Sequence, residues 1–163
     1  AAAAIGVFLA ADLIAVRYGE RALKADEGGL APSAKSIEEL FELAVDAIVD
    51  SGFRPGVDLS LCLDVAASHF TSGEGYRIGG DYVFAADVIE RIGGWVDRFP
   101  IVSVEDGLAE NDWSSWPGLY ARISDKAIVL GMVERALQRQ PGGMPDRSEL
   151  SRDAPGFITH APT

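Results

Sequence analysis

Cysteine and histidine are scarce in this sequence of 163 residues, which limits the chemistry that it can support. The single cysteine, Cys62, excludes a disulfide within the chain and is compatible with a reducing cytoplasm, where we expect the protein to act. Of the two histidines, His69 is expected in a solvated loop, although it could reach a ligand, and His160 is assigned no role.

Basic residues are also few. The sequence has 14 lysines and arginines against 25 aspartates and glutamates, which gives a formal net charge of −11. A field of this sign repels phosphate backbones, so we expect no nucleic-acid partner, whereas divalent cations would be attracted. Most of the acidic residues are expected on a solvated surface.

A long hydrophobic run is lacking as well. The apolar opening segment, residues 1–16, is interrupted by Asp12 and has no basic residue before it. It is too short to cross a bilayer and lacks the charged front of a secretory signal, so we expect a buried helix and no membrane partner. The composition, 48% hydrophobic and 24% charged, is typical of one globular domain.

Helical and strand-like segments alternate along the chain. Apolar spacing and turn residues predict helices over 1–25, between Ser36 and Gly52, and over 84–98, 112–123 and 132–140, strands over 59–65, 101–105 and 127–130, and a small hairpin over 71–82. This alternation predicts right-handed βαβ units and therefore an α/β fold with a parallel sheet. Residues 141–163 are rich in proline, glycine, aspartate and serine and predict an irregular C-terminal tail.

Three acidic residues recur at the spacing of these βα units. Glu27, Asp64 and Glu105 lie about one βα unit apart, and the last two end predicted strands. Because side chains alternate along a strand, Asp64 shares a face with Cys62, and Glu105 shares one with Ser103. Carboxylates brought together repel each other unless a cation or a shared proton intervenes, and Mg²⁺ prefers such oxygen ligands. From the alternation alone, solvated or helix-capping acids remain the slightly favoured alternative.

The segments that carry these acids resemble the enolase family, in matching order and at similar spacing. They are Asp26-Glu27-Gly28-Gly29-Leu30-Ala31-Pro32, Leu63-Asp64-Val65-Ala66-Ala67-Ser68, and Pro100-Ile101-Val102-Ser103-Val104-Glu105-Asp106-Gly107-Leu108 followed by Asn111-Asp112-Trp113. The resemblance covers about residues 25–125. It implies a partial (β/α) TIM-type barrel over residues 1–140, with an active-site face at the carboxyl ends of its strands.

The resemblance also implies a function, the Mg²⁺-dependent reversible dehydration of 2-phosphoglycerate to phosphoenolpyruvate, which is a lyase reaction of glycolysis. It implies that Glu27 assists loss of the hydroxyl and that Asp64 and Glu105 are magnesium ligands. The physical logic agrees, because charge developing on the substrate carboxylate needs a fixed cation and the hydroxyl needs a proton to leave. The expected ligand is therefore a small phosphorylated acid.

One metal ligand of that family is not found here. The family has an aspartate in a Gly-Asp-Asp-Leu sequence at the end of the next strand, whereas Gly131 is followed by Met132, Val133 and Glu134. We expect Val129 and Val133 to face the lumen of the barrel, so that an apolar residue replaces the acid. Mg²⁺ affinity should then be lower.

The catalytic lysine of that family is not found either. Lys126 precedes its strand, at the wrong end of the barrel, and Lys24 and Lys35 flank the acidic turn. Whether the chain is an active enzyme is therefore left open. It is an impaired enolase-type lyase, a non-catalytic module derived from one, or another dehydratase or racemase of the superfamily, which the motifs disfavour. Open strand edges favour a homo-oligomer or a complementing chain.

Overall fold

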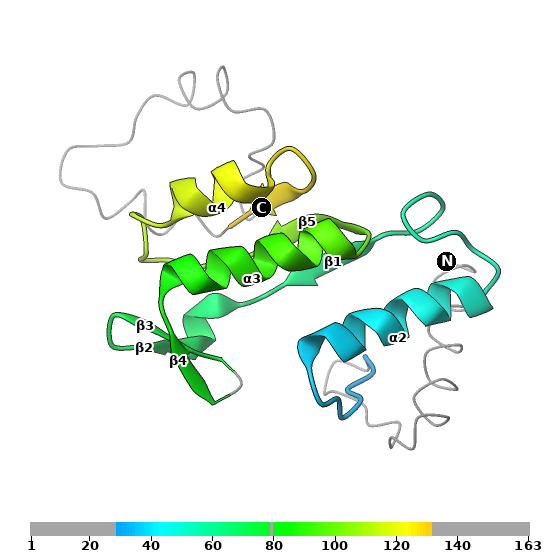
Figure 1. Cartoon of the computed structure of the whole chain (residues 1–163), viewed down its shortest axis with the longest axis horizontal. Coiled ribbons are helices and arrows are strands. Elements are labelled where there is room, and N and C mark those ends of the chain that lie inside the picture. Colours follow the sequence, from blue (N-terminus) through cyan, green and yellow to red (C-terminus); the bar gives the residue numbers. More distant parts are fainter. Residues whose placement is uncertain (1–28, 79, 132–163) are drawn as a thin grey trace, which may run out of the picture. The chain divides into compact units, whose positions relative to one another are not determined.

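The computed structural model describes residues 29–78 and 80–131, which fall into two compact units divided between Leu61 and Cys62 (Figure 1). The elements predicted over 1–25 and 132–140, and the tail over 141–163, lie outside the described residues. Within the described part of the chain, no helix is long and apolar enough to cross a membrane.

The first unit is built on α2 (Ile37–Asp50), the helix predicted between Ser36 and Gly52. The Ser36 Oγ accepts a hydrogen bond from the Glu39 N–H at 3.2 Å, which satisfies one of the unpaired amides of the first turn. The helix ends at Asp50, and its continuation is stopped at Gly52, whose φ of 82° few other residues adopt without strain. Both predicted ends of this helix are therefore confirmed.

The second unit contains a sheet of three strands in the order β1-β5-β6, formed by β1 (Leu61–Asp64), β5 (Ile101–Glu105) and β6 (Ile128–Leu130). β5 and β6 are parallel. The Val65 N–H donates to the Glu105 carbonyl, and the Ala67 N–H donates to the Asp106 carbonyl. The residue numbers of donor and acceptor rise together, so β1 and β5 are parallel as well. The predicted α/β class is confirmed, with a parallel sheet that does not close into a barrel among the described residues.

Two helices, α3 (Ala85–Arg98) and α4 (Trp116–Ile123), pack against each other and against one face of this sheet (Figure 1). The apolar side chains between the layers are at most 1% exposed: Ile92, Val104, Leu119, Ile123 and Val129. Each such side chain contributes about 1.5–3 kcal/mol through burial. A Cβ at Gly107 would lie 2.8 Å from Leu119 Cδ2, so the chain can pass this close to α4 only as glycine.

The opposite face of the sheet carries polar side chains on β1 and at the end of β5. Cys62, Asp64 and Glu105 are exposed there, and Ser103 is half-buried. The alternation predicted for β1 and for the end of β5 is therefore confirmed. The less exposed residues, Leu61 and Leu63 in β1 and Val104 in β5, alternate with the more exposed Asp64 and Glu105.

The predicted orientation of β6 is wrong. Ser103 pairs with Ile128 and Glu105 pairs with Leu130, and register partners in a parallel pair point to the same face. Val129, which we expected to face the lumen, is 1% exposed and packs on the helix side. Both residue sets of this strand are apolar, so alternation could not tell which one α4 covers. The expectation for Val133, which lies outside the described residues, loses its basis.

A second, antiparallel sheet follows β1 and consists of β2 (Thr71–Ser72), β3 (Gly75–Ile78) and β4 (Asp81–Val83), after the short 3-10 helix η1 (Ala67–Phe70). The hairpin predicted over 71–82 is confirmed. The helix predicted over 112–123 starts later, at Trp116, because the Asp112 N–H bonds to the Ala109 carbonyl in a turn.

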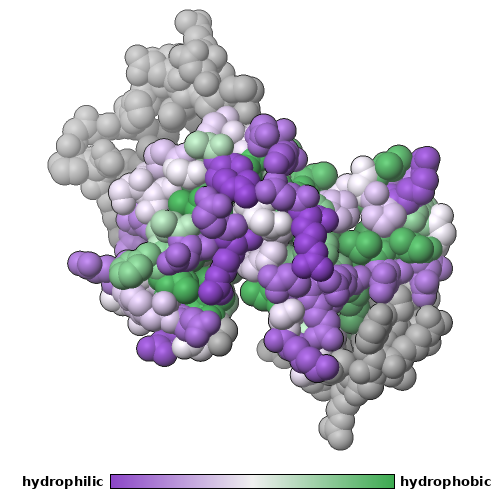
Figure 2. All heavy atoms as spheres, in the orientation of Figure 1, coloured by the Kyte–Doolittle hydropathy of each residue, from purple (hydrophilic) through white to green (hydrophobic). Residues whose placement is uncertain are grey.

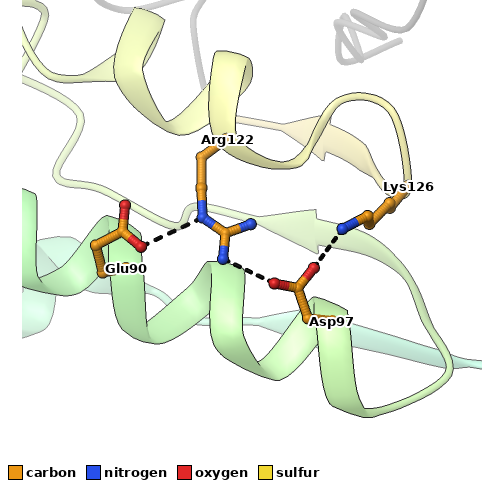
Figure 3. A network of polar contacts seen from close by, with 4 residues as sticks. All are labelled: Glu90, Asp97, Arg122 and Lys126. Carbon is orange, nitrogen blue, oxygen red and sulfur yellow. Dashed lines mark hydrogen bonds and ion pairs between the residues drawn. The ribbon is translucent and has the colours of Figure 1, made fainter.

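The outer surfaces of α3 and α4 are joined by a charged network (Figure 3). Arg122 donates from Nη2 to Asp97 at 2.8 Å and from Nε to Glu90 at 3.3 Å, and Lys126 donates to the other Asp97 oxygen. These bonds lower the pKa of Asp97 to about 2, and the bond from Arg122 has the largest effect, followed by that from Lys126. The network lies on a surface where hydrophilic side chains gather over α3 (Figure 2). Exposed ion pairs contribute little energy, so the network adds only modestly to the apolar packing between the two helices.

Two adjacent glycines of α3 test this network. A Cβ at Gly93 would overlap the guanidinium of Arg122, whereas a Cβ at Gly94 would meet nothing within 4 Å. Alanine is favoured over glycine in a helix by about 1 kcal/mol, so Gly94→Ala should raise the free energy of unfolding by about that amount. Gly93→Ala should raise it less or lower it, because Arg122 must move away from Asp97. Urea unfolding measures the difference. In an Arg122→Ala background the two substitutions should become equal, and a persisting difference would contradict the explanation.

The low pKa of Asp97 predicts a pH dependence of stability. Its folded-state pKa of about 2 lies below the ordinary value of 3.8, so its contribution is complete above about pH 4 and is lost as the pH falls toward 2. Asp97→Asn should therefore reduce the decline of the unfolding free energy over this interval. The exposed Asp81 provides a control with the same change, Asp81→Asn. An equally steep decline in wild type and Asp97→Asn would show that the network does not act this way.

Candidate metal and catalytic site

Asp64 and Glu105 lie side by side at the carboxyl ends of β1 and β5. The Val65 N–H donates to the Glu105 carbonyl at 2.9 Å, and in a parallel ladder this bond sets Asp64 opposite Glu105. Adjacent strands are about 4.8 Å apart, so the two carboxylates leave neighbouring points on the same face. Both side chains are exposed. The structure thus brings together two of the three predicted site acids, and Glu27 lies outside the described residues.

Each of these strands is followed by a residue in the left-handed region, Ala66 with φ of 49° and Asp106 with φ of 46°. Such a conformation is uncommon without glycine and costs about 1 kcal/mol or more. The Ala66 N–H donates to Asp64 Oδ1 at 3.2 Å, and the Asp106 N–H donates to the Leu130 carbonyl at 3.0 Å. A hydrogen bond to Asp64 therefore holds the first of these turns, and a backbone bond to β6 holds the second.

The loop between β5 and α4 is fastened by side chains from distant parts of the second unit. Tyr76 Oη accepts from the Ala109 N–H at 3.1 Å and donates to Asp112 Oδ2 at 2.9 Å. The Ser68 Oγ accepts from the Glu110 N–H at 3.1 Å. We call Tyr76 and Ser68, with these bonds, the loop latch. Tyr76 is 2% exposed, and burial raises the pKa of its hydroxyl from 10.0 to about 12. The hydroxyl is protonated at neutral pH and can donate to Asp112.

The sequence did not reveal the loop latch. The segment around Tyr76 predicts a hairpin, and nothing in it points to a partner in another loop. The bonded residues are 33 to 42 positions apart, far beyond any local periodicity. The only available signal was a tyrosine in a short, glycine-rich hairpin, where a buried hydroxyl requires a partner.

Family membership suggests a divalent metal, and the paired carboxylates are residues that could hold one through water. Mg²⁺ is usually held by one or two carboxylates and takes its other ligands from water and from substrate oxygens. Among the described residues, no group of three or more His, Cys, Asp or Glu side chains is placed to hold a metal. His69 lies exposed in η1 and joins no such group. Asp64 and Glu105 could therefore anchor the ion, but substrate and water must complete its coordination.

Lys126 does not belong to this site. It precedes β6 and binds Asp97 of α3, so it lies at the amino end of the sheet, as the sequence predicts. A groove of about 400 Å³ opens at that same end and is lined by residues 124–129 with Val102 and Tyr120. The two carboxylates are at the opposite end of the strands, so this groove is separate from the candidate site. Beside Glu105, β6 places the apolar Leu130.

A comparison with known families shows which family the chain belongs to. The family described as enolase, C-terminal TIM barrel domain, matches residues 6–133, well over half of the chain. The chain belongs to this enolase family. The match spans every described residue and extends over Glu27. In TIM-barrel enzymes the active site lies at the carboxyl ends of the strands, which is where this enolase-family domain holds Asp64 and Glu105.

A magnesium titration tests whether the two acids act together. Asp64→Asn and Glu105→Gln should each weaken Mg²⁺ binding by at least about tenfold, because each removes half of the charged ligand set. Isothermal titration calorimetry measures this directly. Asp125→Asn changes the charge equally at the other end of β6 and should leave the affinity unchanged. Equal losses in all three variants would show that Mg²⁺ responds only to the net charge of the protein.

Proposed function

We propose that this enolase-family domain serves the Mg²⁺-dependent, reversible dehydration of 2-phosphoglycerate to phosphoenolpyruvate in cytoplasmic glycolysis. The supporting observation is the pairing of Asp64 with Glu105 at the carboxyl ends of adjacent parallel strands. Family membership supports a lyase, and the exposed carboxylate pair suits a hydrated cation that a phosphorylated acid could also bind.

The proposal gives each acid a task. Asp64 and Glu105 hold the cation that offsets the negative charge developing on the substrate carboxylate when the adjacent proton leaves. Glu27 keeps a proton ready for the departing hydroxyl, because hydroxide is a poor leaving group. The role of Glu27 rests on its motif, since the residue lies outside the described part of the chain.

A base must also remove the proton beside the substrate carboxylate. The second unit contains one lysine in its sequence, Lys126, and that residue binds Asp97 away from the site. We therefore propose that the base comes from outside this unit, and that the protein works as a homo-oligomer or with a complementing chain. In the alternative proposal, the chain is a non-catalytic enolase-derived module. The pairing of only two acids within the described residues favours that alternative.

An activity assay separates the two proposals. The full chain is mixed with 2-phosphoglycerate and Mg²⁺, and the absorbance of the phosphoenolpyruvate formed is followed with time. For a lyase we expect turnover that Glu27→Gln and Glu105→Gln each reduce at least about a hundredfold, as is typical for loss of a catalytic acid or a charge-stabilising group. Asp125→Asn should retain full activity, because this residue lies at the other end of the sheet.

Circular dichroism of each variant shows whether the chain is folded in these assays. A folded wild-type chain without turnover would rule out a lyase that acts alone. Analytical ultracentrifugation of the same sample then distinguishes a single copy from an oligomer.

A further inference from the structure

The two candidate metal ligands sit on exposed strand ends, so their relative position depends on the segments that follow them. Asp64 is followed by η1, which contains Ser68, and Glu105 is followed by the loop that contains Ala109 and Glu110. The Val65 N–H donates to the Glu105 carbonyl at the level of the acids, and the Ala67 N–H donates to the Asp106 carbonyl just beyond them. Side-chain hydrogen bonds join the two following segments further from the acids.

The loop latch supplies those bonds. Ser68 ties η1 directly to the Glu110 amide, and Tyr76 reaches the same loop through Ala109 and Asp112. Trp116 Nε1 adds a bond to the Ala109 carbonyl at 3.1 Å from the start of α4. The segment after Glu105 is therefore held from the β1 side and from the hairpin at once.

We propose that Tyr76 and Ser68 are positioning residues of the Asp64–Glu105 site, because the bonds of the loop latch keep the two strand ends together. Neither residue contacts the metal or the substrate in this proposal. The bonds to Ala109 and Glu110 restrain the loop backbone that follows Glu105. The bond from Ser68 restrains η1, which follows Asp64. The link to catalysis rests on the proposed function, but the link to the strand ends does not.

The chemistry of Tyr76 distinguishes this role from simple packing. Its ring could be replaced by that of phenylalanine if it only filled space. Its hydroxyl, however, both accepts from the buried Ala109 amide and donates to Asp112, and it is protonated at neutral pH. Removing the hydroxyl leaves a buried N–H without a partner, which is more costly than losing an exposed bond.

Amide hydrogen exchange of the full chain, followed by NMR, tests the inference without metal or substrate. Tyr76→Phe should speed exchange of the Ala109 amide by roughly tenfold and should also speed exchange of the Val65 amide, which reports on the strand ends. Tyr82→Phe is the matched control, because it is the same change in the same hairpin on a side chain that is 47% exposed. Faster exchange at Ala109 with an unchanged Val65 would overturn the inference.

A magnesium titration then shows whether the effect reaches the site. Ser68→Ala and Tyr76→Phe should each weaken Mg²⁺ binding by about tenfold, as is typical when residues supporting metal ligands are lost. Ser68→Thr keeps the hydroxyl and should restore binding. If Tyr76→Phe does not fold, Ser68→Ala alone decides the question. Wild type that binds no Mg²⁺ would refute the proposed function, while the exchange of Val65 would still decide the role of the loop latch. Unchanged binding and exchange in both variants would overturn that role.

Discussion

The in-register pairing of β1 with β5 is the constraint on which the rest of the candidate site depends. It sets Asp64 opposite Glu105 on one face of a parallel sheet. The hydrogen bonds that do this join backbone groups and do not depend on which side chains the strands carry. Both carboxylates are exposed at this end of the sheet, where a cation could approach them from solvent.

The helix side of the sheet holds the apolar core of the second unit. α3 and α4 bury Val104 and Val129 almost completely, and Gly107 lets the chain following β5 pass close to α4. The charged network of Asp97 with Arg122 and Lys126 joins the two helices at the far end of the sheet. The apolar packing and the exposed carboxylates therefore lie on opposite sides of the sheet.

Membership of the enolase family gives this separation a chemical meaning. The described residues place two carboxylates, Asp64 and Glu105, at the end of the sheet where the active site of a TIM-barrel enzyme lies. They do not supply an evident base, because Lys126 is bound to Asp97 at the opposite end of the strands. Under the proposed function, cation binding and turnover are therefore separable.

The sequence by itself determined what depends on near neighbours. The cap of α2 at Ser36, the alternation that exposes Asp64 and the motif around Glu105 could all be predicted, because each follows from residues within a few positions. Tertiary structure decided which face of β6 is covered by α4 and which groups form hydrogen bonds with Tyr76. Ile128 and Val129 are both apolar, so only the packing of α4 selects which is buried. Tyr76 meets Asp112 only because the fold brings the hairpin and the loop together across 36 positions of sequence.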